Sequence, residues 1–177
     1  TKLAIEGARK SVAKILNVHP SEIFFTSGGT ESNNTAIQSS IRDLGVKHII
    51  TSSIEHHAVT HTVEHFDHLD LVKVSYVKLH ANGHVDLDHL EKLLASVKEK
   101  TLVSLMHANN EIGNMIDIQA VGSLCKKYNA FYHSDTVQTV GHFPFNLRNT
   151  PVHFITGAAH KFHGPKGIGF AYVKKNS

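Results

Sequence analysis

Short runs of β-branched and aliphatic residues alternate with longer amphipathic segments along the chain. The apolar runs predict seven strands, at Ile23–Thr26, His48–Thr51, Leu71–Leu79, Leu102–Met106, Ala130–His133, Phe154–Thr156 and Ile168–Val173. Apolar residues spaced by three and four predict helices near residues 2–17, 30–44, 57–68, 87–98 and 118–128. In the first of these helices, Ile5, Ala8, Val12 and Ile15 would share one face.

The alternation of strands and helices predicts an α/β fold with three layers, α/β/α, around a mostly parallel seven-stranded sheet. The Val-, Ile- and Leu-rich runs lack a clean polar alternation, which is typical of strands covered on both sides. Neither a repeat nor a linker divides the 177 residues, so they predict one domain. Because the chain begins within a predicted helix and ends directly after a predicted strand, we interpret it as a piece of a longer protein.

Composition narrows the classes of function. Hydrophobic residues make up 41% of the chain and charged residues 19%, as in ordinary globular proteins. No apolar run approaches 18 residues, which argues against a membrane span. The net charge is only +3, and the basic residues are scattered, which argues against a nucleic-acid partner. The single cysteine, Cys125, cannot form an internal disulfide, which favours a reducing, cytoplasmic location.

In an open parallel sheet, ligands bind at the carboxyl ends of the strands. We therefore expect the loops that follow Thr26, Thr51, Met106, His133 and Thr156 to converge. The unusual residues of the sequence lie in these five loops. Each loop alone has an ordinary explanation, but five in succession indicate a binding site.

The first two loops offer groups that suit an anion and a ring. Ser27-Gly28-Gly29-Thr30 turns from a strand into a helix, whose free N–H groups and dipole favour a phosphate. A capped helix after a glycine turn is the alternative. His56, in the second loop, could stack on a ring or move protons, or it could be a solvent-exposed histidine.

The next two loops contain amides and an acid. His107 to Gly113 includes Asn109 and Asn110, which offer hydrogen bonds without charge, although an Asx turn would explain them too. Asp135 follows an apolar strand, where an acid is costly unless it is paired. A pyridinium nitrogen would be a fitting partner, and a structural pairing is the alternative.

The fifth loop contains Lys161, which follows the small residues Gly157, Ala158 and Ala159. We expect this lysine to sit deep in the protein and to lose its charge, because a neutral amine can form a Schiff base with an aldehyde. A surface charge is the ordinary alternative for a lysine.

Read together, the loops match one family in order and spacing, and the matching segments are residues 25–34, Glu55-His56, 107–113, 133–138, His160-Lys161 and 164–167. The chain resembles the class V aminotransferase-like, fold-type I enzymes that depend on pyridoxal 5'-phosphate (PLP). Within them it is most similar to the cysteine desulfurases that supply sulfur for iron–sulfur clusters. The resemblance covers essentially all 177 residues and implies that residues 1–177 form the PLP-binding large domain.

The resemblance assigns catalytic and ring-binding roles. It implies that Lys161 holds PLP as a Schiff base and later moves the proton at the substrate Cα. His56 would stack on the ring, and Asp135 would keep the pyridine nitrogen protonated. Gln138 would hydrogen-bond the phenolic oxygen, with Asn110 beside it.

The resemblance also assigns the phosphate site to Gly29, Thr30 and His160. The family usually has a serine that binds phosphate two residues before this histidine, where this chain has Ala158. One phosphate contact is therefore missing or replaced, and Thr156 is a candidate substitute.

The implied reaction removes sulfur from L-cysteine and gives alanine and a protein-bound persulfide, which is passed to an iron–sulfur scaffold or another sulfur acceptor. The implied assembly is a homodimer. The family's nucleophilic cysteine and substrate-binding arginine follow the region that ends at Ser177, its first segment precedes Thr1, and its small domain is C-terminal. The chain alone is therefore expected to be inactive. Cys125 shares a predicted helical face with Val121 and Leu124, so we interpret it as a core residue.

Three alternatives remain. The first is a selenocysteine lyase or another class V lyase or aminotransferase. The second is a metal-binding module, because a predicted helix places His57, His61, His65 and His68 on one stripe, although a solvated histidine-rich face is favoured and no metal is expected at the main site. The third is a catalytically silent domain.

Overall fold

The computed structural model describes residues 2–175. Seven strands form one sheet: β1 (Ile23–Thr26), β2 (His48–Thr51), β3 (Lys73–Tyr76), β4 (Thr101–Ser104), β5 (Phe131–Asp135), β6 (Phe154–Ala158) and β7 (Gly169–Val173). Their order across the sheet is β1-β7-β6-β5-β4-β2-β3. Only β7 runs antiparallel to its neighbours, so the prediction of a mostly parallel seven-stranded sheet is confirmed.

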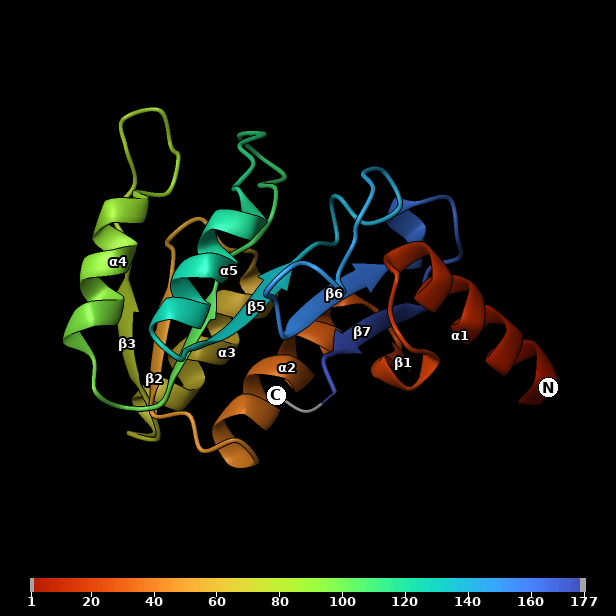
Figure 1. The fold of residues 1–177 in the computed structure, drawn as a ribbon, viewed down its shortest axis with the longest axis horizontal. Coiled ribbons are helices and arrows are strands. Elements are labelled where there is room, and N and C mark those ends of the chain that lie inside the picture. Colours follow the sequence, from red (N-terminus) through yellow and green to blue (C-terminus); the bar gives the residue numbers. More distant parts are fainter. Residues whose placement is uncertain (1, 176–177) are drawn as a thin grey trace.

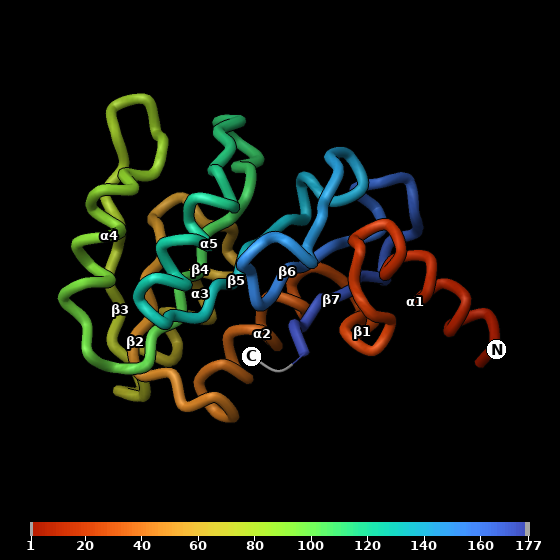
Figure 2. Tube along the Cα trace, viewed as in Figure 1, coloured from red at the N-terminus to blue at the C-terminus, as the bar shows by residue number. Residues whose placement is uncertain are grey.

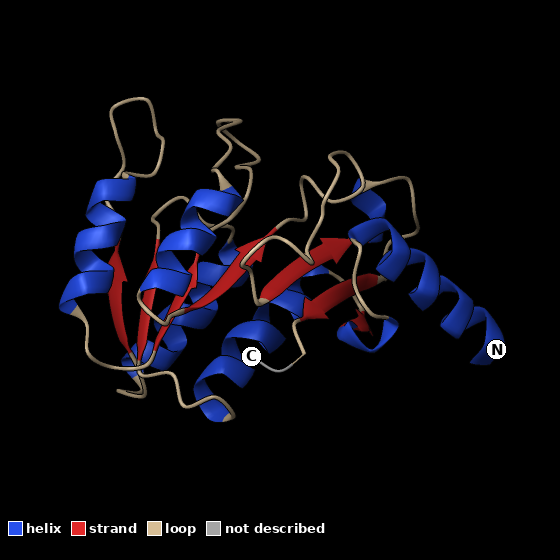
Figure 3. Ribbon diagram, viewed as in Figure 1, coloured by secondary structure: helices blue, strands red, loops and turns tan. Residues whose placement is uncertain are grey.

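Five α-helices cover the sheet: α1 (Lys2–Leu16), α2 (Gly29–Arg42), α3 (His57–His68), α4 (Leu87–Ser96) and α5 (Ile118–Lys127). Helices lie on both faces of the sheet (Figure 3), and two hydrophobic clusters show which helices pack on which face. Residues of α1, α4 and α5 pack on one face of the sheet, and residues of α2 and α3 pack on the other. Adjacent strand residues such as Ile49 and Ile50 belong to opposite clusters, because side chains alternate along a strand. The three-layer prediction is therefore confirmed.

Local chemistry sets the helix boundaries. Asp86 and Asp117 cap α4 and α5, since each side chain accepts backbone N–H groups of the first turn. The residues Asn17, Asp70 and Asn129 follow α1, α3 and α5 with φ between 53° and 56°. Asn and Asp tolerate this left-handed conformation better than other side chains, so they end the helices.

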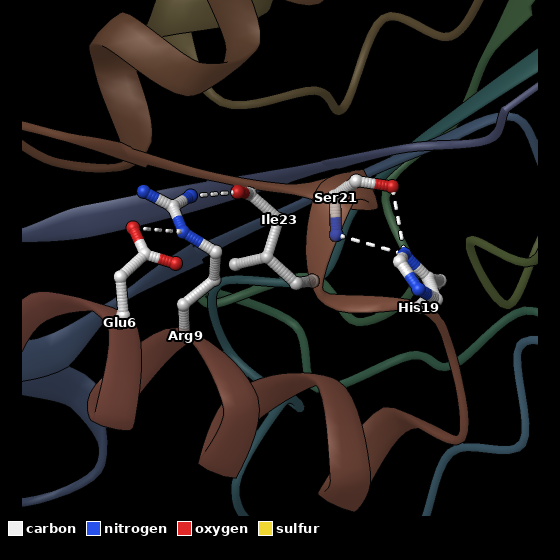
Figure 4. A network of polar contacts seen from close by, with 5 residues as sticks. All are labelled: Glu6, Arg9, His19, Ser21 and Ile23. Carbon is white, nitrogen blue, oxygen red and sulfur yellow. Dashed lines mark hydrogen bonds and ion pairs between the residues drawn. The ribbon is translucent and has the colours of Figure 1, made fainter.

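Helix α1 departs from its predicted orientation. Ile5 and Ile15, on the predicted apolar face, are 52% and 70% exposed, whereas Ala13 and Leu16 are buried. Arg9 lies on the same face as these two buried residues, and its guanidinium donates to the carbonyl of Ile23 in β1 while contacting Glu6 (Figure 4). The predicted face is therefore wrong. The face of α1 that packs on the sheet is the one that can both bind β1 and enter the core.

The segment between α1 and β1 is a short 3₁₀ turn at Pro20–Glu22. His19 caps it: its ring accepts from the backbone N–H of Ser21 (Figure 4). The Glu22 carboxylate accepts the N–H of His19. This capping box directs the chain into the edge strand.

The loops after β3 and β4 extend from the same edge of the sheet (Figures 1 and 2). They are joined by a hydrogen bond of 2.9 Å from the Asn114 side chain to the carbonyl of Asn82. Among the described residues, no helix is both long and apolar enough to cross a membrane.

Candidate active site

The loops after β1, β2, β4, β5 and β6 surround one cavity of about 280 Å³. Strand β1 is antiparallel to β7, which is antiparallel to β6, so β1 runs in the same direction as the parallel strands. All five carboxyl ends therefore meet at one edge, as expected. The lining residues are Gly29, Thr30, Asn33, His56, Met106, Asn110, Asp135, Val137, Gln138, Ala158, His160 and Lys161.

All eight site residues predicted from the sequence line this cavity: Gly29, Thr30, His56, Asn110, Asp135, Gln138, His160 and Lys161. The sequence reasoning missed Asn33 and Met106, which also line it. Asn33 lies within the loop segment that was singled out, but a helical asparagine carries no signal of its own. Met106 reads as an apolar strand residue, and only the tertiary structure places it at the cavity.

The amino end of α2 opens onto the cavity. The helix begins at Gly29, and the backbone N–H groups of its first residues have no acceptor within the helix. The loop before it is held by the Thr26 hydroxyl, which lies 2.7 Å from that of Ser32, and by the Glu31 carboxylate, which accepts the N–H of Ser27 at 2.6 Å. This fixed helix end carries a partial positive charge suited to an anion.

Two glycines keep the backbone around this helix end close to its neighbours. A Cβ on Gly29 would lie 2.6 Å from Cγ2 of Val137. A Cβ on Gly169 of β7 would lie 2.6 Å from the backbone of Gly28. Both distances are shorter than any ordinary carbon contact, so the sheet and helix can approach this closely only with glycine at both positions.

In the loop after β4, two neighbouring asparagines have different roles. The Asn109 side chain accepts the backbone N–H groups of Glu111 and Ile112 at 2.8 and 2.9 Å and donates to the carbonyl of Ile54 at 2.7 Å. It therefore forms the Asx turn considered above. The neighbouring Asn110 is exposed and lines the cavity.

Asp135 is the buried acid of the site, with 5% of its surface exposed. Its Oδ2 accepts from the Asn33 amide at 2.7 Å, and its Oδ1 accepts the N–H of Val137 at 2.9 Å. Burial raises the pKa of Asp135, while these two donors and the positive potential near His56 act to lower it. A cation bound in the cavity would therefore find a carboxylate held by neutral donors.

Lys161 does not sit deep, contrary to expectation. It ends a short 3₁₀ turn, Ala159–Lys161, that follows β6, and its side chain is exposed at the mouth of the cavity. The small residues before it are buried, but the turn directs the chain outward after Ala159. His160 is exposed in the same turn, and His56 is exposed while capping α3, where its Nδ1 accepts the N–H of Ala58 at 3.1 Å.

Thr156 cannot replace the missing phosphate-binding serine. It is fully buried, and its hydroxyl donates to Oδ1 of Asn33 at 2.8 Å. Ala158, which stands at the serine position, lines the cavity without a polar group. The hydroxyl among the cavity-lining residues belongs to Thr30, at the amino end of α2.

Cys125 is fully buried among the residues of α5, and burial raises the pKa of its thiol. This confirms its interpretation as a core residue. In α3, His57 and His61 stack at 5.1 Å. Within residues 2–175, however, no three His, Cys, Asp or Glu side chains come together in a way that could hold a metal ion. The histidine stripe therefore gains no support as a metal site.

The fold and cavity define an α/β domain in which a helix N-terminus, a buried carboxylate and a lysine face one small ligand space. The model of the family described as aminotransferase class-V matches residues 1–177. The chain therefore belongs to the aminotransferase class-V family.

Similar proteins carry more specific names. The chain is 45% identical to the cysteine desulfurase IscS of Dictyoglomus turgidum over 179 residues, which cover 100% of this chain and 45% of that protein. It is 41% identical to the IscS of Methanosarcina thermophila, covering 99% of this chain and 43% of that protein. A solved structure titled "NIFS-LIKE PROTEIN" superposes with a TM-score of 0.93 at 42% identity, covering 99% of this chain and 48% of the other. The chain thus spans about half the length of these relatives.

Proposed function

We propose that this chain is the PLP-binding large domain of a cysteine desulfurase, which removes sulfur from L-cysteine to give alanine and a protein-bound persulfide for iron–sulfur cluster assembly. The observation that supports it most is that eight residues from five separate loops line a single cavity. The names of the relatives agree with it. So does a structure titled "SspA in complex with cysteine", which superposes with a TM-score of 0.88 at 32% identity, covering 98% of this chain and 50% of the other.

The residues present fit PLP at three points. The free N–H groups of α2, the Thr30 hydroxyl and His160 suit its phosphate. Asp135 suits a protonated ring nitrogen, because it is a buried acid whose other contacts are neutral. Lys161 supplies an amine on the same cavity. When bound, PLP supplies an aldehyde and an electron-withdrawing ring.

Each residue then has a task that its position allows. The Lys161 amine holds the cofactor and moves the proton at the substrate Cα, which its place at the mouth of the cavity lets it reach. His56, which lines the cavity at the N-cap of α3, would stack on the cofactor ring. Gln138 and Asn110 offer hydrogen bonds to the ring substituents.

The remaining parts of the reaction lie outside residues 1–177. Cys125 cannot attack the substrate sulfur because it is fully buried and its thiol does not ionise at neutral pH. We therefore propose that a cysteine and a carboxylate-binding arginine beyond this region complete the site, in a cytoplasmic homodimer that passes sulfur to a scaffold protein.

The cofactor is tested by titrating the full-length protein with PLP and following its visible absorbance. We expect a bound-cofactor band in the wild type that is lost in Lys161→Ala. Lys166→Ala is the matched control, because Lys166 is an exposed lysine of the same loop that does not line the cavity. Loss of the band in both variants, or in neither, would contradict the role of Lys161.

The reaction is tested separately by supplying the full-length protein with L-cysteine, L-selenocysteine or an oxo acid as amino acceptor. We expect alanine and sulfide from L-cysteine as the preferred reaction. A strong preference for selenocysteine, or for amino transfer, would replace the desulfurase proposal with the corresponding class V activity.

A further inference from the structure

A chain of buried hydrogen bonds connects three strands behind Asp135. In register, Ser104 of β4 pairs with His133 of β5, and Asp135 of β5 pairs with Thr156 of β6. His133 and Asp135 are two residues apart, so both side chains point to the face of the sheet that α2 covers. Asn33 of α2 reaches into this group. These five residues are all nearly or fully buried.

The side-chain amide of Asn33 contacts three partners. Its Nδ2 donates to Oδ2 of Asp135 at 2.7 Å. Its Oδ1 lies 2.8 Å from the hydroxyl of Thr156 and 3.0 Å from Nε2 of His133. If the amide were reversed, its oxygen would face Oδ2 of Asp135, and only a protonated acid could satisfy that contact.

The orientation that directs the Asn33 N–H at Asp135 also sets the tautomer of His133. Full burial lowers the pKa of His133 to about 3, so the ring is neutral and has one N–H. Nδ1 lies 2.8 Å from the hydroxyl of Ser104, which can donate to it. With the Asn33 N–H directed at Asp135, Oδ1 of Asn33 faces Nε2 of His133, so the neutral ring has its proton on Nε2 and accepts the Ser104 hydroxyl at Nδ1.

We propose that Asn33, held by His133 and Thr156, is a positioning residue that keeps Asp135 an ionised acceptor for a cationic ring nitrogen in the cavity. The inference rests on the proposed function for the identity of that ring. It goes beyond the proposed function in assigning a task to Asn33, His133, Thr156 and Ser104. Of these four residues, Asn33 alone lines the cavity, and it acts through Asp135.

Other ionisable groups lie around the same cavity, and His56 and Glu55 interact electrostatically with Asp135. Glu55 follows β2, His56 begins α3, and His160 and Lys161 follow β6. None of them belongs to the hydrogen-bonded chain, so their charges are the same in all variants of Asn33 and Thr156. A change that appears in Asn33→Ala and not in Asn34→Ala therefore reports on the amide, whereas Thr156 also lowers the pKa of Asp135 through its own hydrogen bond.

The test measures the carboxyl of Asp135 directly by ¹³C NMR, in full-length protein labelled at aspartate and freed of cofactor. The signal is assigned by its loss in Asp135→Asn. We expect Asn33→Ala to raise the pKa of Asp135 by about one unit or more, because the ionised form loses a donor. Asn34→Ala is the matched control, since Asn34 is the next residue of α2 and its side chain lies 2.6 Å from the Thr62 hydroxyl, away from the cavity.

A second pair of variants keeps the proposal testable if Asn33→Ala does not fold. Thr156→Val keeps the shape of the side chain and removes the donor to Asn33, so it should raise the pKa of Asp135 in the same direction. Thr156→Ser retains the hydroxyl and should restore the wild-type value. An Asp135 pKa that is unchanged in folded Asn33→Ala and in Thr156→Val would overturn the proposal.

The same proteins, titrated with PLP, separate this inference from the proposed function. We expect PLP affinity to fall off at a pH about one unit higher in Asn33→Ala than in the wild type, so that below the measured pKa of Asp135 the variant binds up to about tenfold more weakly. Asn34→Ala should bind normally. If even wild-type protein fails to bind PLP while the pKa of Asp135 responds as expected, the cofactor is wrong and the positioning role stands. If Asn33→Ala binds PLP with normal affinity, the proposal that Asn33 positions Asp135 for the ring nitrogen is overturned.

Discussion

Both side-chain oxygens of Glu55 accept the backbone N–H of Met106, at 3.1 and 2.9 Å. The hydroxyl of Ser52 donates to the same group at 2.7 Å. This contact joins the loop after β2 to the end of β4. His56, which follows Glu55 in the chain, and Met106 both line the cavity. Glu55 therefore holds one wall of the site together.

The first prediction concerns pH. Burial raises the pKa of Glu55 to about 8, the nearby Asp135 acts in the same direction, and the donors from Ser52 and Met106 oppose it. Glu55 therefore keeps its proton in the folded protein at pH values where the unfolded chain, with the ordinary pKa of glutamate, has released it. This contribution to stability is fully present at acid pH and is lost as pH rises to about 8, with a slope approaching about 1.4 kcal/mol per pH unit.

Denaturant unfolding at several pH values checks this. We expect Glu55→Gln to flatten the decline of the free energy of unfolding between weakly acid pH and pH 8. Glu111→Gln is the control, because Glu111 is an exposed carboxylate of the neighbouring loop. Identical pH profiles for the two variants would refute the prediction.

The second prediction concerns the contact of Gly29 with Val137. Gly29→Ala places a methyl group 2.6 Å from a Val137 methyl, so the start of α2 must shift. We expect a loss of about 1 to 3 kcal/mol in the free energy of unfolding, together with weaker PLP binding. Adding Val137→Ala should recover much of the loss by making room.

Gly28→Ala is the matched control for this steric argument. Its added Cβ would meet no atom within 4 Å, and its backbone is extended, with φ of 162°. Its effect on stability should be small. An equal loss in Gly28→Ala would mean that the loop needs glycine for flexibility and not for space.

The third prediction concerns the thiol of Cys125. Its burial and raised pKa predict that iodoacetamide modifies it only after unfolding. Peptide mapping of native and denatured protein measures this at the individual residue. Modification of native protein at the rate of the denatured chain would show that α5 opens and exposes its inner face.

The fourth prediction is the tautomer of His133. ¹⁵N NMR of the histidine rings should show His133 neutral at pH 7, with its proton on Nε2. Ser104→Ala removes the donor to Nδ1 and should increase the population of the other tautomer. A wild-type ring that has its proton on Nδ1 would mean that Asn33 is oriented the other way.

The sequence was sufficient for the sheet and for the converging loops. The boundaries of β1, β2 and α3 agree with the predicted ranges, because each is a short apolar run or periodic segment between clear turn residues. Strand β3 is shorter than its predicted range, since Leu71 and Leu79 are apolar residues of the flanking loops.

What failed depends on tertiary contacts. The predicted face of α1 was wrong because helical spacing cannot tell which of two apolar stripes packs on the sheet. The hydrogen bond from Arg9 to a backbone carbonyl of β1 sets which face is turned inward. The depth of Lys161 was wrong because small neighbours predict burial of the strand but not the direction of the turn that follows. The roles inferred for Asn33 and Thr156 arise from strand register, which sequence periodicity does not specify.

Strand order has a consequence for biosynthesis. Strand β1, made early, is bonded only to β7, the last strand described, and β7 in turn lies between β1 and β6. The loop that enters α2 also rests against Gly169 of β7. While the chain is still emerging from the ribosome, β2 to β5 can pair, but β1 and the anion-binding helix end must wait. The ligand site is therefore completed only after synthesis has passed Val173.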